Sequence, residues 1–367
     1  MRDSRVEALA QILVRYSTKV ETGDVCVIQG PTTGEPLIQA VYEEVLRAGG
    51  LPVMQLVTEE AQAAFFELAS DEQLDWVQPP AEWAAEHADV RIVVMADANA
   101  RALSGADPAK QARAQRARRK IMEMSMRRAA EGKHRWALTL FPTHAYAGEA
   151  GMSLSAYERF FYDACLVADG DPVTAWQRQS DEVVRLAEWI EGREEVHVTA
   201  PGTDVRLGIA GRTWVPCVGT HNMPDGELFT GPVEDAVDGE VAFSFPASYG
   251  GREVSGVRLR FEAGRVVDAS AERGEAFLIE MLDTDDGART LGELGIGTNY
   301  GIATATKEIL LDEKIGGTVH MAIGAAYPET GAVNKSAVHW DMVCDLRQGG
   351  SIHVDGIELQ RDGTFLV

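Results

Sequence analysis

The stretch VCVIQGPTTGEPLIQAVYEEVLRAGGLPVMQLV, residues 25–57, decides the fold of the first half of the chain. It begins with an apolar strand (25–30), continues with a helix-periodic segment that stops at two glycines (34–50), and ends in a second strand (52–57). The same alternation continues in three further segments: strand 90–97, helix 107–131 and strand 135–141. Strands that alternate with helices are typical of an α/β layer with a largely parallel sheet, and we predict this fold.

The second half of the chain has a different pattern. After a helical stretch at 172–191 come short strands separated by glycine-containing turns. We predict three hairpins, at 195–211, 256–271 and 351–367, and one helix among them, at 272–283. A chain of 367 residues is long enough for two domains. We therefore predict an α/β domain over 1–190 and an α+β domain, rich in antiparallel strands, over 191–367.

Charge and cysteine content restrict the partners and the compartment. The formal net charge of -23 disfavours nucleic acid and anionic membrane surfaces, because phosphate binding depends on Lys and Arg. The basic run at 110–120 is interpreted as a solvated helix face. No segment has the roughly 18 apolar residues of a membrane helix, and the N-terminus lacks the apolar core of a signal peptide. Four cysteines without a C-x-x-C pair suit a reducing compartment, so we expect a cytoplasmic protein.

The strand SAVHWDMVCDL, residues 336–346, carries a histidine and an acid two positions apart. Side chains of a strand alternate between two faces, so His339 and Asp341 share one face while Trp340, Met342 and Cys344 share the other. A half-exposed edge strand gives the same pattern. The other residues of the second half must therefore decide whether His339 and Asp341 lie on a solvent-exposed edge strand or in a functional site.

Four further residues of the second half are candidates for chemistry. Glu227 follows a Pro-Asp-Gly turn, Glu293 lies among leucines and glycines, His320 has only small residues beside it, and Tyr327 follows at the end of the same strand. Taken singly, Glu227 could be a solvated turn residue, Glu293 an exposed one and His320 a core histidine. Taken together, Glu227, Glu293 and His320 form with His339 and Asp341 a set of five oxygen and nitrogen ligands suited to zinc, cobalt, manganese or magnesium.

Five ligands exceed the needs of one tetrahedral catalytic metal ion, which must keep a position open. Two ions about 3.5–4 Å apart that share a bridging carboxylate need about this number. Such a pair can hold a hydroxide and polarise a carbonyl group, which is the chemistry of metal-assisted amide hydrolysis. The pattern therefore favours two divalent metal ions in the C-terminal domain.

The segments that carry these residues resemble the metal-site segments of the M29 family of metallo-aminopeptidases, the thermophilic aminopeptidase T type. They are NMPDGELFTGP (222–232), GELGIGTN (292–299), TVHMAIG (318–324) with Tyr327, and HWD (339–341). RWALTLFPTHAYA and GMSLSAYERFF, within 135–161, also resemble the N-terminal half of the family. The resemblance spans most of the chain, which is shorter than the better-known members.

This resemblance implies a homodimer of two-domain subunits around an inner cavity, which acts on peptide substrates with a dinuclear metal site. Carried over position by position, the metal ligands would be Glu227, Glu293, His320, His339 and Asp341. Tyr327 would lie beside the metal ions. On this basis we predict that Tyr327 donates a hydrogen bond to the oxyanion and that Glu293, which is flanked by glycines, is the bridging ligand. Tyr327 and Glu293 are thus the predicted catalytic residues, and the general base is left open.

Two alternatives differ in class. The wider family also resembles an iron-dependent dioxygenase that opens a dihydroxypyridine ring, and a mononuclear iron site of two histidines and one carboxylate would leave Glu227 and Glu293 surplus. The other alternative is a non-catalytic dimer with a structural metal ion. The open space beside His320 and the presence of Tyr327 favour an enzyme over this second alternative.

Overall fold

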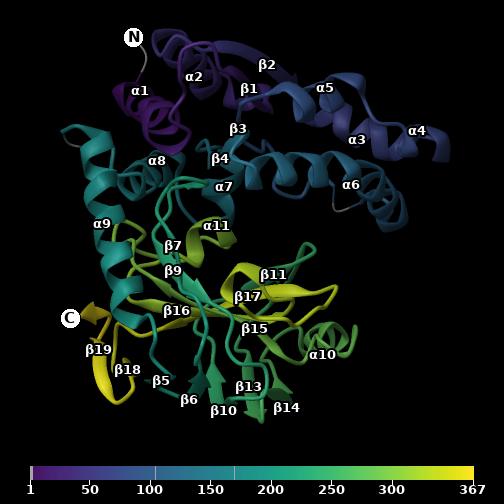
Figure 1. Ribbon diagram of the computed structural model, residues 1–367. Coiled ribbons are helices and arrows are strands. Elements are labelled where there is room, and N and C mark those ends of the chain that lie inside the picture. The colour runs from purple at the N-terminus through teal and green to yellow at the C-terminus, as the bar shows by residue number, and fades with distance from the viewer. Residues whose placement is uncertain (1–2, 104, 169) are drawn as a thin grey trace. The chain divides into compact units, whose positions relative to one another are not determined.

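The structure, a computed structural model, describes residues 3–103, 105–168 and 170–367, and the chain divides into two compact units (Figure 1). Unit 1 comprises Met1–Trp176 with Gly219–Met223, and unit 2 comprises Gln177–Val218 and Pro224–Val367. The division falls inside helix α9, which runs over Pro172–Ile190. The boundary predicted near residue 190 lies at the end of the same helix.

A five-stranded sheet forms the centre of unit 1, with strand order β2-β1-β3-β4-β8 and parallel pairing throughout. Its strands are β1 (Val25–Pro31), β2 (Leu51–Val57), β3 (Val90–Met95), β4 (Arg135–Leu140) and β8 (Asn222–Met223). The parallel sheet predicted from the alternation of strands and helices is confirmed. Strand β8 was not predicted, because two residues give no hydrophobic pattern.

Helices accompany this sheet along the chain. They are α1 (Ser4–Gln11), a π-helix (Ile12–Ser17), a short 3-10 turn (Thr32–Gly34), α2 (Glu35–Arg47), α3 (Glu59–Leu68), α4 (Asp71–Asp75), α5 (Pro79–His87), α6 (Pro108–Ala130), α7 (His144–Glu149) and α8 (Leu154–Ala164). Helix α2 begins with proline in its first turn, buries Leu37, Ile38 and Val41 as one stripe, and ends before Gly49, whose φ of +85° suits glycine. The helices α3 to α6 lie together in Figure 1, where α6 contacts α4 and α5.

Both faces of the parallel sheet are covered. The side chain of Ile38 on α2 packs near Gly30 of β1 and Val94 of β3, whereas Ala84 and Ala88, in and just after α5, form a cluster with Val27 of the opposite face. Burial on both faces explains why the strands read as continuous apolar runs rather than as alternating ones. The predicted α/β layer is therefore present in unit 1.

Unit 2 contains one eight-stranded and one five-stranded antiparallel sheet with a small hairpin. The larger sheet, sheet B, has the order β14-β13-β10-β6-β5-β18-β19-β20, and the smaller one, sheet C, has the order β17-β16-β15-β9-β7. The strands of sheet B are β5 (Glu195–Ala200), β6 (Thr203–Gly208), β10 (Val237–Ala242), β13 (Arg258–Glu262), β14 (Arg265–Ser270), β18 (Ser351–Val354), β19 (Ile357–Arg361) and β20 (Thr364–Phe365). The predicted antiparallel α+β domain is confirmed.

Sheet C carries the side chains that the sequence singled out. Its strands are β7 (Val215–Cys217), β9 (Glu227–Thr230), β15 (Leu291–Gly297), β16 (Thr318–Gly324) and β17 (His339–Asp345). The remaining elements of unit 2 are the hairpin β11 (Ala247–Tyr249) and β12 (Arg252–Val254), the helices α10 (Glu275–Leu282) and α11 (Ile309–Asp312), and a 3-10 turn (Pro328–Thr330). One face of sheet C is apolar: Ile296, Met321 and Trp340 belong to a core that also contains side chains of sheet B. The opposite face, here called the site face, is therefore the one available for polar groups.

A β-bulge decides which way Glu293 points. Leu291 pairs with Ile323, but Glu293 pairs with Ala322, so the register shifts at Gly292. Leu291 and Leu294, three positions apart, can therefore both enter the core, and Glu293 turns to the site face. The carbonyl oxygens of Gly324 and Ala325 come so close to Gly292 that a Cβ atom there would overlap them.

Among the helices in the part of the chain that the structure describes, none combines the length and apolar character needed to cross a bilayer. The four cysteines at positions 26, 165, 217 and 344 are all free thiols.

We predict that Gly292→Ala destabilises the chain by about 1–3 kcal/mol, because the added methyl group forces the two facing carbonyl groups apart. Chemical denaturation measures the change in the free energy of unfolding. Gly148→Ala is the control, because a Cβ atom at this position in α7 meets nothing within 4 Å, and alanine favours helix. Equal stability of the two variants would contradict the close approach at Gly292.

Candidate metal centre

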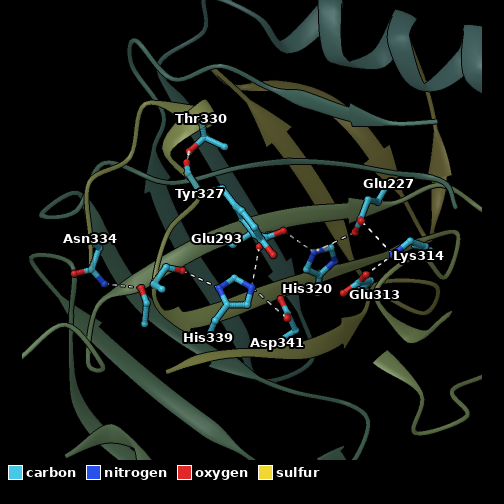
Figure 2. Close-up of polar contacts among 12 residues, drawn as sticks. Glu227, Glu293, Glu313, Lys314, His320, Tyr327, Thr330, Asn334, His339 and Asp341 are labelled. Carbon is cyan, nitrogen blue, oxygen red and sulfur yellow. Dashed lines mark hydrogen bonds and ion pairs between the residues drawn. The ribbon is translucent and has the colours of Figure 1, made fainter. Parts of the chain in front are cut away.

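All five predicted ligands lie on the site face of sheet C (Figure 2). Strand β9 supplies Glu227, β15 supplies Glu293, β16 supplies His320, and β17 supplies both His339 and Asp341. Ladder pairing aligns them: Glu293 and Asp341 flank Ala322 from opposite sides. Four strands distant in sequence thus bring the five side chains to one place.

Small residues alternate with the large ones on this face. Gly295 pairs directly with His320, and Gly324 pairs with His339. The imidazole of His320 lies over Gly295 so closely that a Cβ atom there would overlap the ring. The absence of a side chain at position 295 therefore gives the ring its place beside Glu293.

Strand β17 is the outer strand of sheet C, as the alternative of a half-exposed edge strand requires. Its polar residues nevertheless face the other ionisable groups. The side chains of His339 and Asp341 are 27% and 11% exposed, while those of Glu227 and Glu293 are each 7% exposed and that of His320 is 1% exposed. The five side chains form a largely buried cluster.

Each histidine faces two carboxylates at nearly the same separation. His320 Nε2 lies 3.3 Å from both Glu227 Oε2 and Glu293 Oε1. His339 Nε2 lies 3.3 Å from Glu293 Oε2 and 3.4 Å from Asp341 Oδ2. Glu293 thus directs one carboxylate oxygen toward each histidine and is the member that both halves of the cluster share.

These separations fit a metal ion. Nitrogen and oxygen ligands about 2.0–2.2 Å from a tetrahedral ion lie about 3.3–3.5 Å from one another. One ligand atom each of Glu293, His339 and Asp341 lies within 4.8 Å of the other two. His320 Nδ1 and Asp341 Oδ1 are buried without a hydrogen-bond partner among the described residues. Separations near the limit of a hydrogen bond, together with unpaired buried polar atoms, suit a ligand set for a metal ion.

The orientation of His339 is fixed from behind. Its Nδ1 donates a hydrogen bond of 2.8 Å to the carbonyl oxygen of Ala325, which leaves Nε2 directed at Glu293 and Asp341. Asn334 in turn donates to the carbonyl oxygen of Gly324, the residue before Ala325. A backbone carbonyl behind a histidine is a frequent partner of metal-binding imidazoles.

The charges of the cluster shift the pKa values of its members. Burial opposes the charged forms of both histidines, but the neighbouring carboxylates outweigh it and raise the pKa of His320 to about 10 and that of His339 to about 11. Burial also raises the pKa of Glu293, yet the hydrogen bonds from the two histidines prevail and lower it to about 2. Burial raises the pKa of Glu227 to about 8, although Lys314 and His320 act in the opposite direction.

Two residues that the sequence analysis missed complete the cluster. Lys314 Nζ lies 3.2 Å from Glu227 Oε1 and also contacts Glu313 Oε1. Glu313 follows α11 directly, and burial and the charge of Asp341 raise its pKa while Lys314 and His320 lower it. The only signal in the sequence was the Glu-Lys pair in LDEKIGG, just before strand β16. Because the pair lies outside any strand, the alternation of side chains could not predict which way these two residues point.

Tyr327 lies beyond the end of β16, and its ring packs against His339 and Phe229. The ring centroids are 5.1 Å and 5.3 Å apart, respectively. Partial burial, with the nearby carboxylates, raises the pKa of Tyr327 above its usual value, so the hydroxyl group keeps its proton. Its side chain is exposed at the border of the cluster, where a bound molecule can reach it.

Comparison with known proteins gives consistent matches over nearly the whole chain. Residues 2–365 match the family described as thermophilic metalloprotease (M29). The chain is 28% identical over 395 residues to aminopeptidase T of Thermus thermophilus, covering 98% of this chain and 95% of that protein. It is 25% identical over 406 residues to aminopeptidase 2 of Geobacillus stearothermophilus, covering 97% and 94%.

Solved structures give the same result. The structure of wild-type AmpT from Thermus thermophilus superposes with a TM-score of 0.84 at 27% identity, and the match covers 99% of each chain. A 2,5-dihydroxypyridine dioxygenase from Pseudomonas putida has a TM-score of 0.60 at 13% identity and covers 99% of this chain and 97% of that one. The second likeness concerns the fold alone.

We predict that metal binding to the metal-free chain releases protons and becomes tighter as pH rises. At pH 7 the raised pKa values keep His320 and His339 protonated, and a metal ion must displace these protons. The apparent affinity should therefore rise by about tenfold per pH unit for each displaced proton between about pH 6 and pH 8. Calorimetric titrations in buffers of different ionisation enthalpy count the protons; an affinity that does not change with pH would contradict the prediction.

Proposed function

Because this chain belongs to the M29 family of metallopeptidases, we propose that it is an aminopeptidase that releases amino-terminal residues from peptides. Family membership confirms the resemblance noted in the sequence and makes the chain a metal-dependent hydrolase. The proposal for the site is a dinuclear centre held by Glu227, Glu293, His320, His339 and Asp341. The observation that carries it is the position of Glu293, with one oxygen toward each histidine.

The arrangement supports two ions rather than one. Each histidine has its own pair of carboxylate oxygens, and only Glu293 takes part in both pairs. A site of two histidines and one carboxylate would leave two buried carboxylates outside it, at a cost of several kcal/mol each unless another cation were present. When bound, two divalent ions acidify a water molecule and polarise the scissile carbonyl group. Zinc, cobalt, manganese and magnesium all suit these ligands.

Glu313 is the general base in this proposal. It is a largely buried carboxylate, 17% exposed, outside the five-ligand set, and the charges of His320 and Asp341 act on it. Burial raises its pKa, which makes it a better proton acceptor, and contact with Lys314 keeps its carboxylate in place. It would take a proton from the attacking water and return it to the leaving amine.

Tyr327 is the proposed donor to the oxyanion. Its hydroxyl group is protonated, and an edge-to-face contact with His339 and a tilted contact with Phe229 hold the ring next to the site. A correctly placed donor of this kind contributes about 10²–10³ in rate. The aromatic surface of Phe229 and Tyr327 also offers apolar contact to the first side chain of a peptide.

Two further proposals concern the state of the protein. We propose a homodimer, as the family resemblance implies, and a cytoplasmic location, which the four free thiols favour. Light scattering of the purified chain and fractionation of the source cells test them independently of the chemistry.

We predict different losses for two glutamate variants. Glu293→Gln removes the charge shared by both histidines, so it should lower the metal content and abolish turnover. Glu313→Gln removes only the proposed base, so the metal content should persist while kcat falls by about 10²–10⁴. Elemental analysis and steady-state kinetics on both variants distinguish the roles. Near-normal turnover by either variant would contradict the role assigned to that residue.

We also predict that the enzyme requires a free amino terminus. An unblocked aminoacyl anilide should be hydrolysed, whereas the same compound acetylated on nitrogen should react at least about 10³ times more slowly, because acetylation removes the lone pair that anchors the substrate. The two rates are compared at equal substrate concentration on one metal-loaded preparation. Equal cleavage of both compounds would indicate an endopeptidase and refute the aminopeptidase proposal.

A further inference from the structure

Lys314 is a fully buried lysine directly behind the proposed metal ligands. Its side chain is 0% exposed, and Nζ contacts Glu227 and Glu313. Figure 2 shows the Glu227 carboxylate between Lys314 and His320, with Oε1 toward the lysine and Oε2 toward the histidine. Burial of an ammonium group costs several kcal/mol unless opposite charges compensate it. The surroundings of Lys314 must therefore be strongly acidic.

Four groups, here called the acidic cluster, belong to these surroundings: Glu227 and Glu313, which contact the ammonium group, and Cys217 and Asp225, which lie beside Glu227. One ligand atom each of Cys217, Asp225 and Glu227 lies within 4.8 Å of the other two. Cys217 and Glu227 pair across β7 and β9, so both project from the site face of sheet C. The three carboxylates raise the pKa of Lys314 against the effect of burial. Burial and the carboxylates raise the pKa of Cys217, and Lys314 acts against them. The ammonium group is thus within electrostatic reach of every member.

A thiol and two carboxylates at this spacing are a ligand set for zinc or cadmium. The cluster needs a positive charge for the same reason that a metal site does, since buried carboxylates are unfavourable without one. We propose that Lys314 is the built-in cation of the acidic cluster: it keeps metal ions away from Cys217 and Asp225 and confines them to the His320 side of Glu227.

This role of Lys314 limits the number of metal ions that the chain binds and fixes the orientation of the Glu227 carboxylate. With Oε1 engaged by Lys314, only Oε2 of Glu227 remains for an ion next to His320. The confinement of ions to that side rests on the proposed function, whereas the exclusion of an ion from the acidic cluster does not depend on the reaction.

Cadmium titration of the full chain tests this inference, because a cadmium–thiolate bond has its own ultraviolet charge-transfer absorption. Lys314→Ala should bind one cadmium ion per chain more than the natural chain and should show this absorption, and Cys217→Ser in the same background should abolish the absorption. Lys133→Ala, which removes an exposed lysine paired with Glu131, is the matched control and should change neither readout.

Loss of a buried cation leaves carboxylates unpaired, so the alanine variant is also made together with Glu313→Gln, which removes one negative charge. Should either variant be unstable without metal, cadmium should raise its melting temperature more than that of the natural chain. The inference is overturned if Lys314→Ala folds but binds no additional cadmium ion. It is also overturned if the natural chain itself shows the cadmium–thiolate absorption and loses it on Cys217→Ser. Because each readout is a difference from the natural chain, missing peptidase activity would refute the proposed function and leave this inference standing.

Discussion

The compensation of buried charge is the constraint on which the site depends. Sheet C places three carboxylates and two histidines on one face, and nearly all of them are withdrawn from water. Without counter-charges, such a face would cost more than a small domain gains by folding. In the structure, acidic and basic side chains alternate instead. Glu227 and Glu293 each lie between two basic groups, and Lys314 is the last basic group on the Glu227 side. The same compensation can be supplied by metal ions, which explains why the ligand separations suit them.

This arrangement needs space as well as charge. Gly295 leaves room for the His320 ring beside β15. The bulge at Gly292 turns Glu293 out of the core while Leu291 and Leu294 stay in it. The apolar face of the same strands packs into the core shared with sheet B. The candidate site is therefore built on the strands of a sheet rather than on loops, which favours accurate placement of its side chains.

Local periodicity carried much of this information in the sequence. Alternation alone predicted that His339 and Asp341 share a face, and the strand–helix alternation of 25–57 predicted the parallel sheet. Contacts between distant segments carried the rest. Glu313 and Lys314 lie in a turn, where no period fixes the direction of a side chain, and they reach the cluster only because α11 ends beside it. Strand β8 joins the sheet of unit 1 from a position within the second half of the sequence, which a linear division at residue 190 excludes.

The fold does not determine the reaction, since a dioxygenase shares it at low sequence identity. The number and sign of the buried charges are more specific. An iron site of two histidines and one carboxylate is satisfied by fewer ligands than this face provides, and Lys314 can neutralise only part of the surplus. Glu293 directs its two oxygens toward different histidines, which supports the proposal that it bridges two ions. The ligand inventory of sheet C thus favours the proposal of hydrolysis at a dinuclear centre, in which Glu313 would supply a base that is not itself a ligand.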